Sequence, residues 1–243
     1  MNYKIKIAYD GTRFNGWQRQ KENDNTIQTV IEKAIADVLG EKVEINGSGR
    51  TDAGVHAKGQ VANFKTGVKI DKEAFLREVN GKLPSTIALK TVEEAEERFH
   101  ARLNAKSKIY EYTLWKAPYN NAFGKRFAFE CDGLDVEKMR KAAESFIGTH
   151  DFIGFSSLKK SKKSTVRTVY SIDIAETDEV IKISYKGNGF LYNMVRIMTG
   201  TLIEAGEGKK DAEDIKAVLE TGVRSLAGFT APPMGLCLKD VFY

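Results

Sequence analysis

Residues 43–65 read VEINGSGRTDAGVHAKGQVANFK, two apolar stretches separated by a segment whose first ten residues, the loop 47–56, contain three glycines. The stretches at 43–46 and 61–65 read as strands, so the pattern predicts a strand, a loop and a strand. The loop has no Gly-Lys-Ser/Thr ending, and its spacing lacks the third glycine of the dinucleotide fingerprint. Both of those phosphate-binding motifs also join a strand to a helix, so the sequence excludes them here.

The residues before this stretch predict a strand followed by a helix. Residues 3–9 alternate with a period of two, which is typical of a strand with one exposed face. Apolar residues then recur at helical spacing from 27 to 39. Asn25 or Thr26 is suited to cap this helix, and Gly40 to end it.

The residues after the stretch complete a repeating order of elements. Asp71 is expected to cap a helix that runs through about Leu83, and residues 87–93 form the next strand. The first part of the chain thus has the order β-α-β-β-α-β. The second part repeats it, with a further helix, at residues 108–115, 136–147, 165–175, 180–185, 190–204, 212–220 and 236–242.

This order predicts an α+β protein built from two tandem ferredoxin-like (βαββαβ) halves with mainly antiparallel sheets. The first half covers residues 1–104 and carries the loop of residues 47–56, and the second covers residues 105–243. No Pro/Gly-rich linker separates them, so we expect the two halves to join into one body.

Bulk composition favours an ordinary protein of the cytoplasm. The 243 residues carry a net charge of +5, which suits a phosphate-rich partner without proving one. Two distant cysteines indicate neither a disulfide framework nor a thiolate metal cluster. The sequence has no secretion signal, and no apolar run approaches the ~20 residues that span a membrane. The basic run at 159–164 is either a solvated loop or a phosphate-contacting arm.

Asp52 is the candidate working carboxylate, with Arg50 beside it in the glycine-rich loop. An aspartate in such a turn often binds only its own backbone. Arg196, however, lies in an otherwise apolar helical stretch, where a guanidinium needs an acidic partner. Asp52 is one candidate for that partner, although other acidic residues would serve equally well on sequence alone.

Tyr110 and Tyr112 alternate on a predicted strand and therefore point to one face of it. They are either two core aromatics or a stacking surface for a displaced base. His150 is either a structural residue at a helix end or an RNA-facing one. The three histidines have no metal-ligand spacing, so no metal site is predicted.

Seven motifs in the same order along the chain resemble those of TruA-type tRNA pseudouridine synthases. They extend over most of the sequence, so the resemblance is specific. The motifs lie at residues 9–18 (YDGTRFNGWQ), 47–57 (GSGRTDAGVHA), 99–102 (FHAR), 110–112 (YEY), 148–152 (GTHDF), 189–196 (GFLYNMVR) and 231–236 (APPMGL).

The resemblance implies the pseudouridine synthase fold and a reaction without cofactor or metal, in which uracil is detached from C1′, turned, and rejoined through C5. Asp52 would be the nucleophile, attacking either the ring or the sugar, and Arg196 would pair with it. Arg50 would displace the target base from the stem. Tyr110 would stack on that base and assist removal of the C5 proton. The implied substrates are uridines at positions 38, 39 and 40 of the tRNA anticodon stem-loop, and the implied assembly is a homodimer.

Two other classes of protein remain open alternatives. A non-catalytic RNA-binding module would present surface aromatics on a ferredoxin-like sheet and would tolerate the loss of Asp52. A nucleotide-processing enzyme with metal-held carboxylates is disfavoured because no other acidic residue lies close to Asp52 in sequence.

Overall fold

The computed structural model describes residues 1–22, 24–158 and 164–243, so most of the basic run at 159–164 lies outside the described residues. The chain divides into two compact units. Unit 1 comprises Met1–Lys106 and Cys237–Tyr243, and unit 2 comprises Ser107–Leu236.

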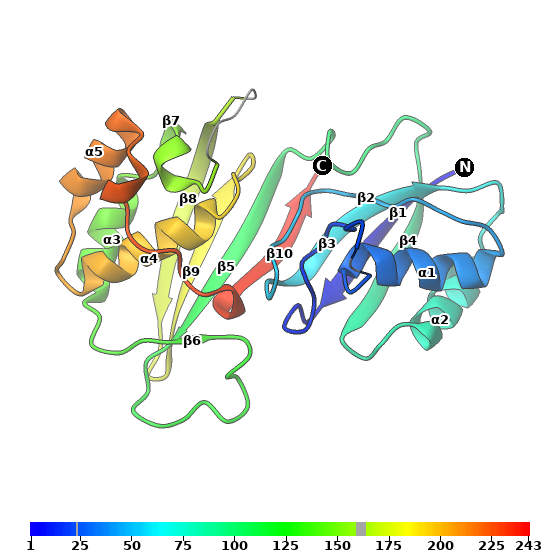
Figure 1. Ribbon diagram of the computed structural model, residues 1–243, viewed down its shortest axis with the longest axis horizontal. Helices are drawn as coiled ribbons and strands as arrows, with labels where there is room; N and C mark the ends of the chain where they lie inside the picture. Colours follow the sequence, from blue (N-terminus) through cyan, green and yellow to red (C-terminus); the bar gives the residue numbers. More distant parts are fainter. Residues whose placement is uncertain (23, 159–163) are drawn as a thin grey trace. The chain divides into compact units, whose positions relative to one another are not determined.

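Unit 1 is a mainly antiparallel sheet with two helices (Figure 1). Strand β1 lies between β4 and β3 and is antiparallel to both, and β2 pairs with β3. The helices pack against each other, and α2 also packs against β4. The elements are β1 (Asn2–Tyr9), α1 (Ile27–Leu39), β2 (Asn46–Gly47), β3 (His56–Lys65), α2 (Lys72–Lys82), β4 (Ile87–Ala95) and β10 (Leu236–Phe242).

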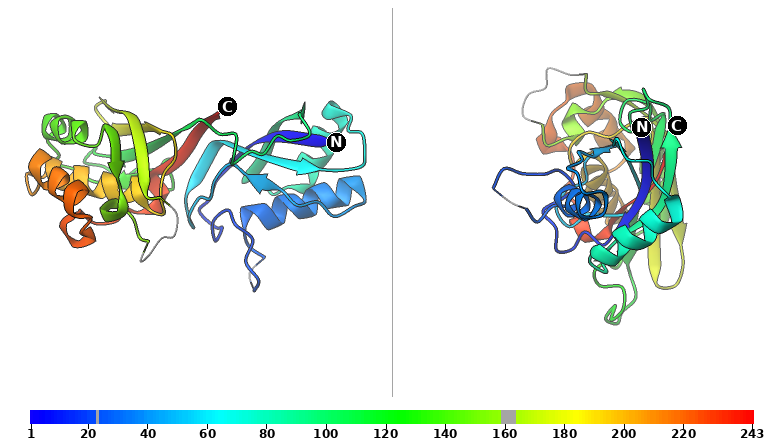
Figure 2. Two further views of the ribbon diagram at one scale, coloured as in Figure 1. Left: turned by 90° about the horizontal axis from the view of Figure 1, so that it is seen from above. Right: turned by 90° about the vertical axis from the view of Figure 1, so that its right-hand side faces the viewer.

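Unit 2 contains a second, mainly antiparallel set of strands and three α-helices, of which α3 packs against both α4 and α5 (Figure 2). Strand β9 lies between β5 and β8, and β7 extends the set beside β8. The elements are β5 (Ser107–Trp115), β6 (Phe129–Glu130), α3 (Val136–Glu144), β7 (Gly148–Asp151), η1 (Ile153–Phe155), β8 (Val166–Glu176), β9 (Val180–Gly187), α4 (Met194–Gly206), α5 (Ala212–Thr221), η2 (Arg224–Leu226) and η3 (Pro233–Gly235).

The α+β class with mainly antiparallel strands is confirmed. The division at residues 104 and 105 into two joined ferredoxin-like halves stays a prediction. The last strand, β10, was predicted in the second half, yet its residues from Cys237 onward lie in unit 1. The reason is hydrogen bonding, because β10 runs parallel to β3 with Cys237 opposite His56.

The ends of α1 follow the prediction because local chemistry decides them. The Thr26 side chain accepts a hydrogen bond from the Thr29 backbone N–H at the start. Gly40 ends the helix with a φ of 73°, a conformation that glycine adopts without steric cost.

Two predicted boundaries were wrong because tertiary contacts override the local pattern. The strand predicted at 43–46 is reduced to β2, since the backbone of Ile45 bonds to side chains of α1 instead of a neighbouring strand. The helix predicted from Phe190 begins only at Met194. Asn193, which precedes it, has a φ of 60°, which breaks the helical path.

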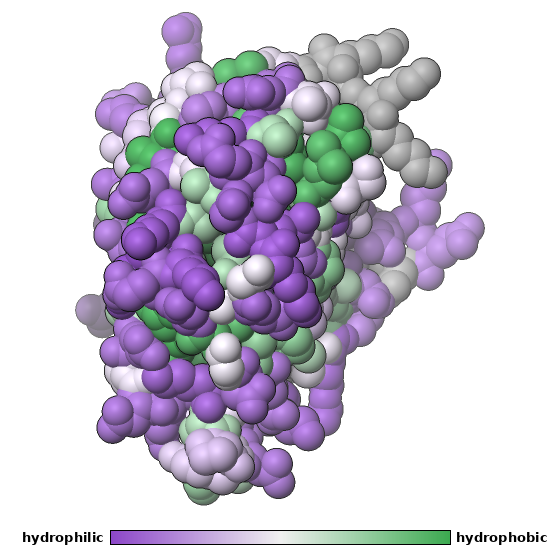
Figure 3. All heavy atoms as spheres, turned by 90° about the vertical axis from the view of Figure 1, so that its left-hand side faces the viewer, coloured by the Kyte–Doolittle hydropathy of each residue, from purple (hydrophilic) through white to green (hydrophobic). Residues whose placement is uncertain are grey.

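Each unit has its own apolar core. Ile5, Ile7 and Phe64 are fully buried in unit 1, and Phe146 and Phe152 are fully buried in unit 2. The face of the protein seen in Figure 3 is largely hydrophilic, with separate hydrophobic patches. Within the described residues, none of the helices is long and apolar enough to cross a membrane.

Replacing Asp71 tests the local rule that starts α2. Its carboxylate accepts a hydrogen bond from the Ala74 backbone N–H at 2.9 Å. We expect Asp71→Ala to lower the free energy of unfolding by about 1 kcal/mol, the usual effect of losing an N-cap. Asp71→Asn keeps the acceptor and should remain close to wild type in urea denaturation, and equal losses in both variants would contradict the capping role.

Candidate active site

The loop between β2 and β3 is fixed first by Gln60, a polar residue in the buried part of β3. Its Oε1 accepts hydrogen bonds from Ser48 Oγ (2.7 Å) and from the Val61 backbone N–H (3.2 Å). Its Nε2 donates to the carbonyl of Gly49 at 3.0 Å. Ser48 and Gln60 are both completely buried, so the start of the loop is tied to β3 from within the core.

Thr51 is the second buried anchor. Its hydroxyl is hydrogen-bonded to the Tyr9 hydroxyl at 2.8 Å, and its carbonyl accepts from the Trp17 backbone N–H at 3.0 Å. Burial raises the pKa of Tyr9 far above its ordinary value, although its bond to Thr51 partly opposes the shift. Tyr9 therefore stays a neutral hydroxyl that holds the backbone directly before Asp52.

Asp52 lies in a tight turn whose backbone has no room to shift. Its carbonyl accepts from the Val55 backbone N–H at 3.1 Å, and Gly54 completes the turn with a φ of 78°. A Cβ on Gly11 would lie 2.0 Å from the Val55 carbonyl oxygen, and one on Gly16 would lie 3.2 Å from the Asp52 carbonyl carbon. Only glycine permits these approaches. The Asp52 residue itself is half-buried, between buried anchors.

His56 anchors the end of the loop. It is 4% exposed, and its Nδ1 accepts from the Gly11 backbone N–H at 3.1 Å. The same Nδ1 lies 3.3 Å from Asp10 Oδ1. Its described contacts make His56 a structural residue that links the loop to the segment following β1.

Arg50, in contrast, is exposed on the loop. Its Nε donates to Gln18 Oε1 at 3.1 Å. Gln18, Tyr9 and Gln60 were not predicted from the sequence as site residues. Gln18 and Tyr9 lie in the motif at 9–18, and Gln60 interrupts an apolar strand; these were the available signals.

The two tyrosines of β5 differ in their surroundings. Tyr112 is completely buried, and its hydroxyl donates to the Pro232 carbonyl at 2.7 Å. Burial raises its pKa, while the charge of Arg196 acts in the opposite direction. Tyr110 is 8% exposed, and its ring meets that of Phe190 edge-on at 5.4 Å. Tyr112 is thus a core aromatic, and Tyr110 is the member of the pair placed at the edge of the core.

Arg196 is half-buried in the first turn of α4. Its Nε donates to the Ala231 carbonyl at 2.7 Å, and one terminal nitrogen donates to Asn193 Oδ1 at 2.9 Å. The Ala231 backbone N–H returns a bond to the Arg196 carbonyl at 3.0 Å. These bonds fix the guanidinium against unit 2. Its pairing with Asp52, a residue of unit 1, stays a prediction.

His150 on β7 has the contacts of a structural residue. Its Nε2 lies 3.0 Å from the Ile147 carbonyl oxygen, and its ring meets the Phe152 ring edge-on at 5.8 Å. Among residues 1–22, 24–158 and 164–243, no group of three or more His, Cys, Asp or Glu side chains is placed to hold a metal ion.

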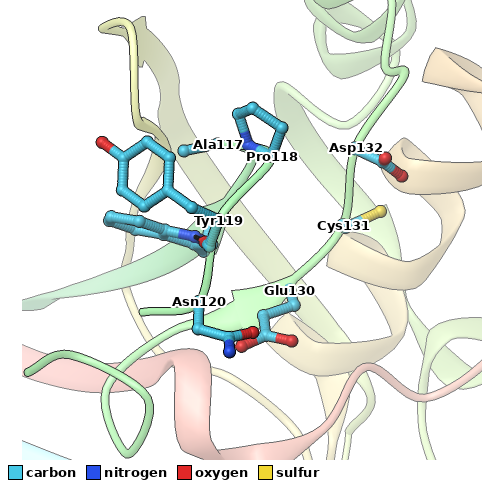
Figure 4. A pocket seen from close by; sticks show the side chains of 8 residues that line it. Ala117, Pro118, Tyr119, Asn120, Glu130, Cys131 and Asp132 are labelled. Carbon is cyan, nitrogen blue, oxygen red and sulfur yellow. Dashed lines mark hydrogen bonds between the residues drawn. The ribbon is translucent and has the colours of Figure 1, made fainter. Parts of the chain in front are cut away.

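None of the predicted site residues lines a pocket of about 300 Å³ in unit 2 (Figure 4). Its lining residues come from two stretches of the chain: Trp115, Ala117, Pro118, Tyr119 and Asn120 from the first, and Glu130, Cys131 and Asp132 from the second. Neither Tyr110 nor Arg196 contributes to it. Its two carboxylates also make it unsuited to a phosphate group, so this pocket is not the candidate active site.

Comparisons with known proteins agree over nearly the whole chain. The family model described as tRNA pseudouridine synthase matches residues 5–104 and 142–243. The chain is 48% identical over 243 residues to tRNA pseudouridine synthase A of Clostridium botulinum (strain Eklund 17B / Type B), covering 100% of this chain and 99% of the relative. It is 45% identical over 241 residues to tRNA pseudouridine synthase A 2 of a Bacillus cereus strain, covering 99% and 98%.

A solved structure is similar only remotely. A chain in the crystal structure of a Cbf5–Nop10–Gar1 complex matches 97% of this chain with 48% of its own length. The TM-score is 0.36 and the identity is 12%, values too low to bear on function.

Replacing Tyr9 tests whether the second anchor holds the loop. We expect Tyr9→Phe to lower the free energy of unfolding by about 1–3 kcal/mol, because the buried Thr51 hydroxyl loses a partner. Hydrogen exchange of the amides at 48–55 should become faster. Tyr185→Phe is the matched control, since it removes a similar buried bond, to Thr199 at 2.8 Å, within unit 2. Equal loop exchange in the two variants would show that Tyr9 does not hold the loop.

Proposed function

This chain belongs to the tRNA pseudouridine synthase family, and from that premise we propose that it isomerises uridines of the tRNA anticodon stem-loop with Asp52 as the nucleophile. Membership makes the protein an isomerase that acts on tRNA. One observation carries the assignment of Asp52. Buried bonds hold the backbone on both sides of it, while the residue itself is only half-buried. A pre-positioned carboxylate of this kind suits nucleophilic catalysis.

The proposed reaction conserves every atom of the uridine except the exchanged C5 proton. The N1–C1′ bond breaks, the uracil turns, C5 bonds to C1′, and the proton on C5 leaves while N1 gains one. Asp52 starts this sequence by attacking either the ring or the sugar, and the bond that it forms breaks again before the product leaves, so that the carboxylate is regenerated. Arg196 is proposed to pair with it, because a carboxylate beside a guanidinium remains ionised. The bonds that fix Arg196 to Ala231 and Asn193 support such a role, since they orient its guanidinium.

Arg50 is proposed to displace the target base and to occupy its place in the stem. Base extrusion costs a few kcal/mol of unstacking and unpairing, which an inserted side chain offsets. A planar guanidinium can both stack on bases and donate to phosphates. The exposure of Arg50, only two residues from Asp52, supports this division of roles.

Tyr110 is proposed to stack on the displaced uracil and to assist removal of the C5 proton through its hydroxyl. Its edge contact with Phe190 restrains the ring, so stacking would cost little side-chain entropy. Tyr110 is 8% exposed whereas Tyr112 is completely buried, so Tyr110 is the candidate of the pair.

The proposal extends to the substrate positions and the assembly. Uridines 38, 39 and 40 are the proposed targets, and a cytoplasmic homodimer is the proposed active form. A net charge of +5 per chain supports binding of a polyanion across two subunits.

Asp52→Asn tests the nucleophile. We expect the variant to bind tRNA like the wild type and to lose pseudouridine formation by at least about a thousandfold, or about 4 kcal/mol of barrier. Tritium release from 5-tritiated uridine in tRNA measures the activity. Asp37→Asn, an exposed position on α1, should retain full activity. Near-wild-type release by Asp52→Asn would overturn the nucleophile assignment, and tight binding without turnover in the wild type would favour the non-catalytic RNA-binding alternative.

Tyr110→Phe tests the hydroxyl of the stacking residue. Stacking and tRNA affinity should persist, while the single-turnover rate falls by about tenfold, because one proton-transfer group is lost. Tyr112→Phe is the control, since it removes a core hydrogen bond and should lower stability without slowing turnover at a temperature where the protein stays folded. An unchanged single-turnover rate in Tyr110→Phe would mean that its hydroxyl has no part in the chemistry.

A further inference from the structure

A chain of hydrogen bonds beneath Arg50 begins at a buried carboxylate on α1. Glu32 is only 7% exposed. Its Oε1 accepts from Gln28 Nε2 at 2.9 Å and from the Ile45 backbone N–H at 3.0 Å, and its Oε2 forms an ion pair with Arg19 at 2.9 Å. An ionised carboxylate can only accept hydrogen bonds. It therefore sets the direction of every bond that follows.

The orientation of the Gln28 side-chain amide is fixed by its bond to Glu32. Because Glu32 only accepts, the amide NH₂ of Gln28 must face it, and the same NH₂ donates to the Ile45 carbonyl at 3.2 Å. The amide oxygen then faces the other way, where it accepts from Gln18 Nε2 at 2.9 Å and from the Arg19 backbone N–H at 3.0 Å. Gln28 is 3% exposed, so reversing its amide would place buried donors against donors.

Gln18 connects Gln28 to Arg50 in the loop of residues 47–56. Its NH₂ is turned toward Gln28, so its Oε1 is the atom presented to Arg50 Nε at 3.1 Å. If the Gln18 amide were reversed, its NH₂ would point at the N–H groups of the guanidinium, which has no acceptor. Only one orientation of the two amides satisfies the whole chain.

The positions of these polar residues are not explained by packing alone. Gln28 and Glu32 are four residues apart on α1 and lie on its buried face together with Ile27, Ile31 and Ile35. Apolar side chains would be expected at such positions. Burying an amide and a carboxylate there costs free energy unless all their groups are bonded, as they are here.

We propose that Glu32, Gln28 and Gln18 form a directional relay of positioning residues that holds the Arg50 guanidinium ready to displace the target base. The proposal rests on the role proposed above for Arg50. A free arginine side chain loses conformational entropy when it is ordered. The relay orders the Arg50 side chain before RNA binds, and it fixes this side chain with respect to α1 rather than to the loop that contains it.

The last acceptor of the relay is neutral, and this suits its task. A carboxylate at position 18 would bind the guanidinium by a charge-assisted bond and compete with the RNA. An amide oxygen holds Arg50 more weakly, so the guanidinium can transfer to the stem when the base leaves.

The test compares one variant on two anticodon stem-loops, with the target uridine paired in one and mismatched in the other. Gln18→Leu removes the last link at an exposed position and should leave the fold intact. We expect its single-turnover rate to fall about tenfold, or about 1.4 kcal/mol, on the paired substrate and less than twofold on the mismatched one, with unchanged affinity for tRNA. Gln20→Leu is the control, because Gln20 is exposed nearby and bonds only the Asn15 carbonyl in the described contacts.

A double-mutant cycle shows whether Gln18 acts through Arg50. In an Arg50→Ala background, Gln18→Leu should cause no further loss, since the two changes remove one shared interaction. Gln28→Leu, which is buried, should reproduce the substrate-dependent loss if thermal unfolding shows it folded. Equal losses on paired and mismatched substrates, or an additive loss in the Arg50→Ala background, would overturn the relay.

The outcome also separates the relay from the proposed function. If Arg50→Ala slows only the paired substrate and Gln18→Leu matches the wild type, the relay fails while the role of Arg50 stands. If Arg50→Ala has wild-type single-turnover rates on both substrates, the proposed role of Arg50 is wrong and the relay is wrong as well. The Asp52→Asn result is independent of both.

Discussion

A single buried carboxamide, that of Gln60, ties β3 to the loop that carries the proposed chemistry. Both ends of the group are used, the oxygen by Ser48 and the Val61 N–H, and the nitrogen by the Gly49 carbonyl. Since a buried amide with an unmet bond costs about 1–3 kcal/mol, the loop cannot leave β3 without a penalty. Arg50 comes directly after Gly49 in the sequence, so its backbone is held close to β3 while its side chain is exposed.

Buried polar groups are also fully hydrogen-bonded at Thr51 in the loop and in unit 2. The hydroxyls of Tyr9 and Tyr185 are each bonded to a buried threonine, and burial raises the pKa of both tyrosines far above the ordinary value. Their hydroxyls are therefore fixed structural bonds rather than groups that titrate. Buried hydroxyl pairs of this kind allow a polar residue to sit in the core while it restrains a segment at the surface.

Neutral oxygens contribute to holding both arginines for which a role is proposed. Gln18 accepts from Arg50, and the Ala231 carbonyl and Asn193 side chain accept from Arg196. A neutral acceptor orients a guanidinium without cancelling its charge, and that charge is what attracts a polyanion or stabilises a carboxylate. Orientation and charge are thus supplied by different groups, which is useful in an enzyme that must bind tRNA and then release it.

The sequence by itself determined the α+β class, the ends of α1 at Thr26 and Gly40, and the position of Asp52 in a glycine turn between strands, because each depends on residues close together in the chain. The sequence motifs likewise identified the family. Only the tertiary structure decided that Ile45 leaves its predicted strand and that α4 starts at Met194. It also revealed the bonds that fix the loop, whose partners come from β1, β3 and the segment between β1 and α1. Periodicity reports which face of an element is buried, but it does not report which distant polar atom meets it, and buried polar atoms are satisfied by contacts that form only when the chain has folded.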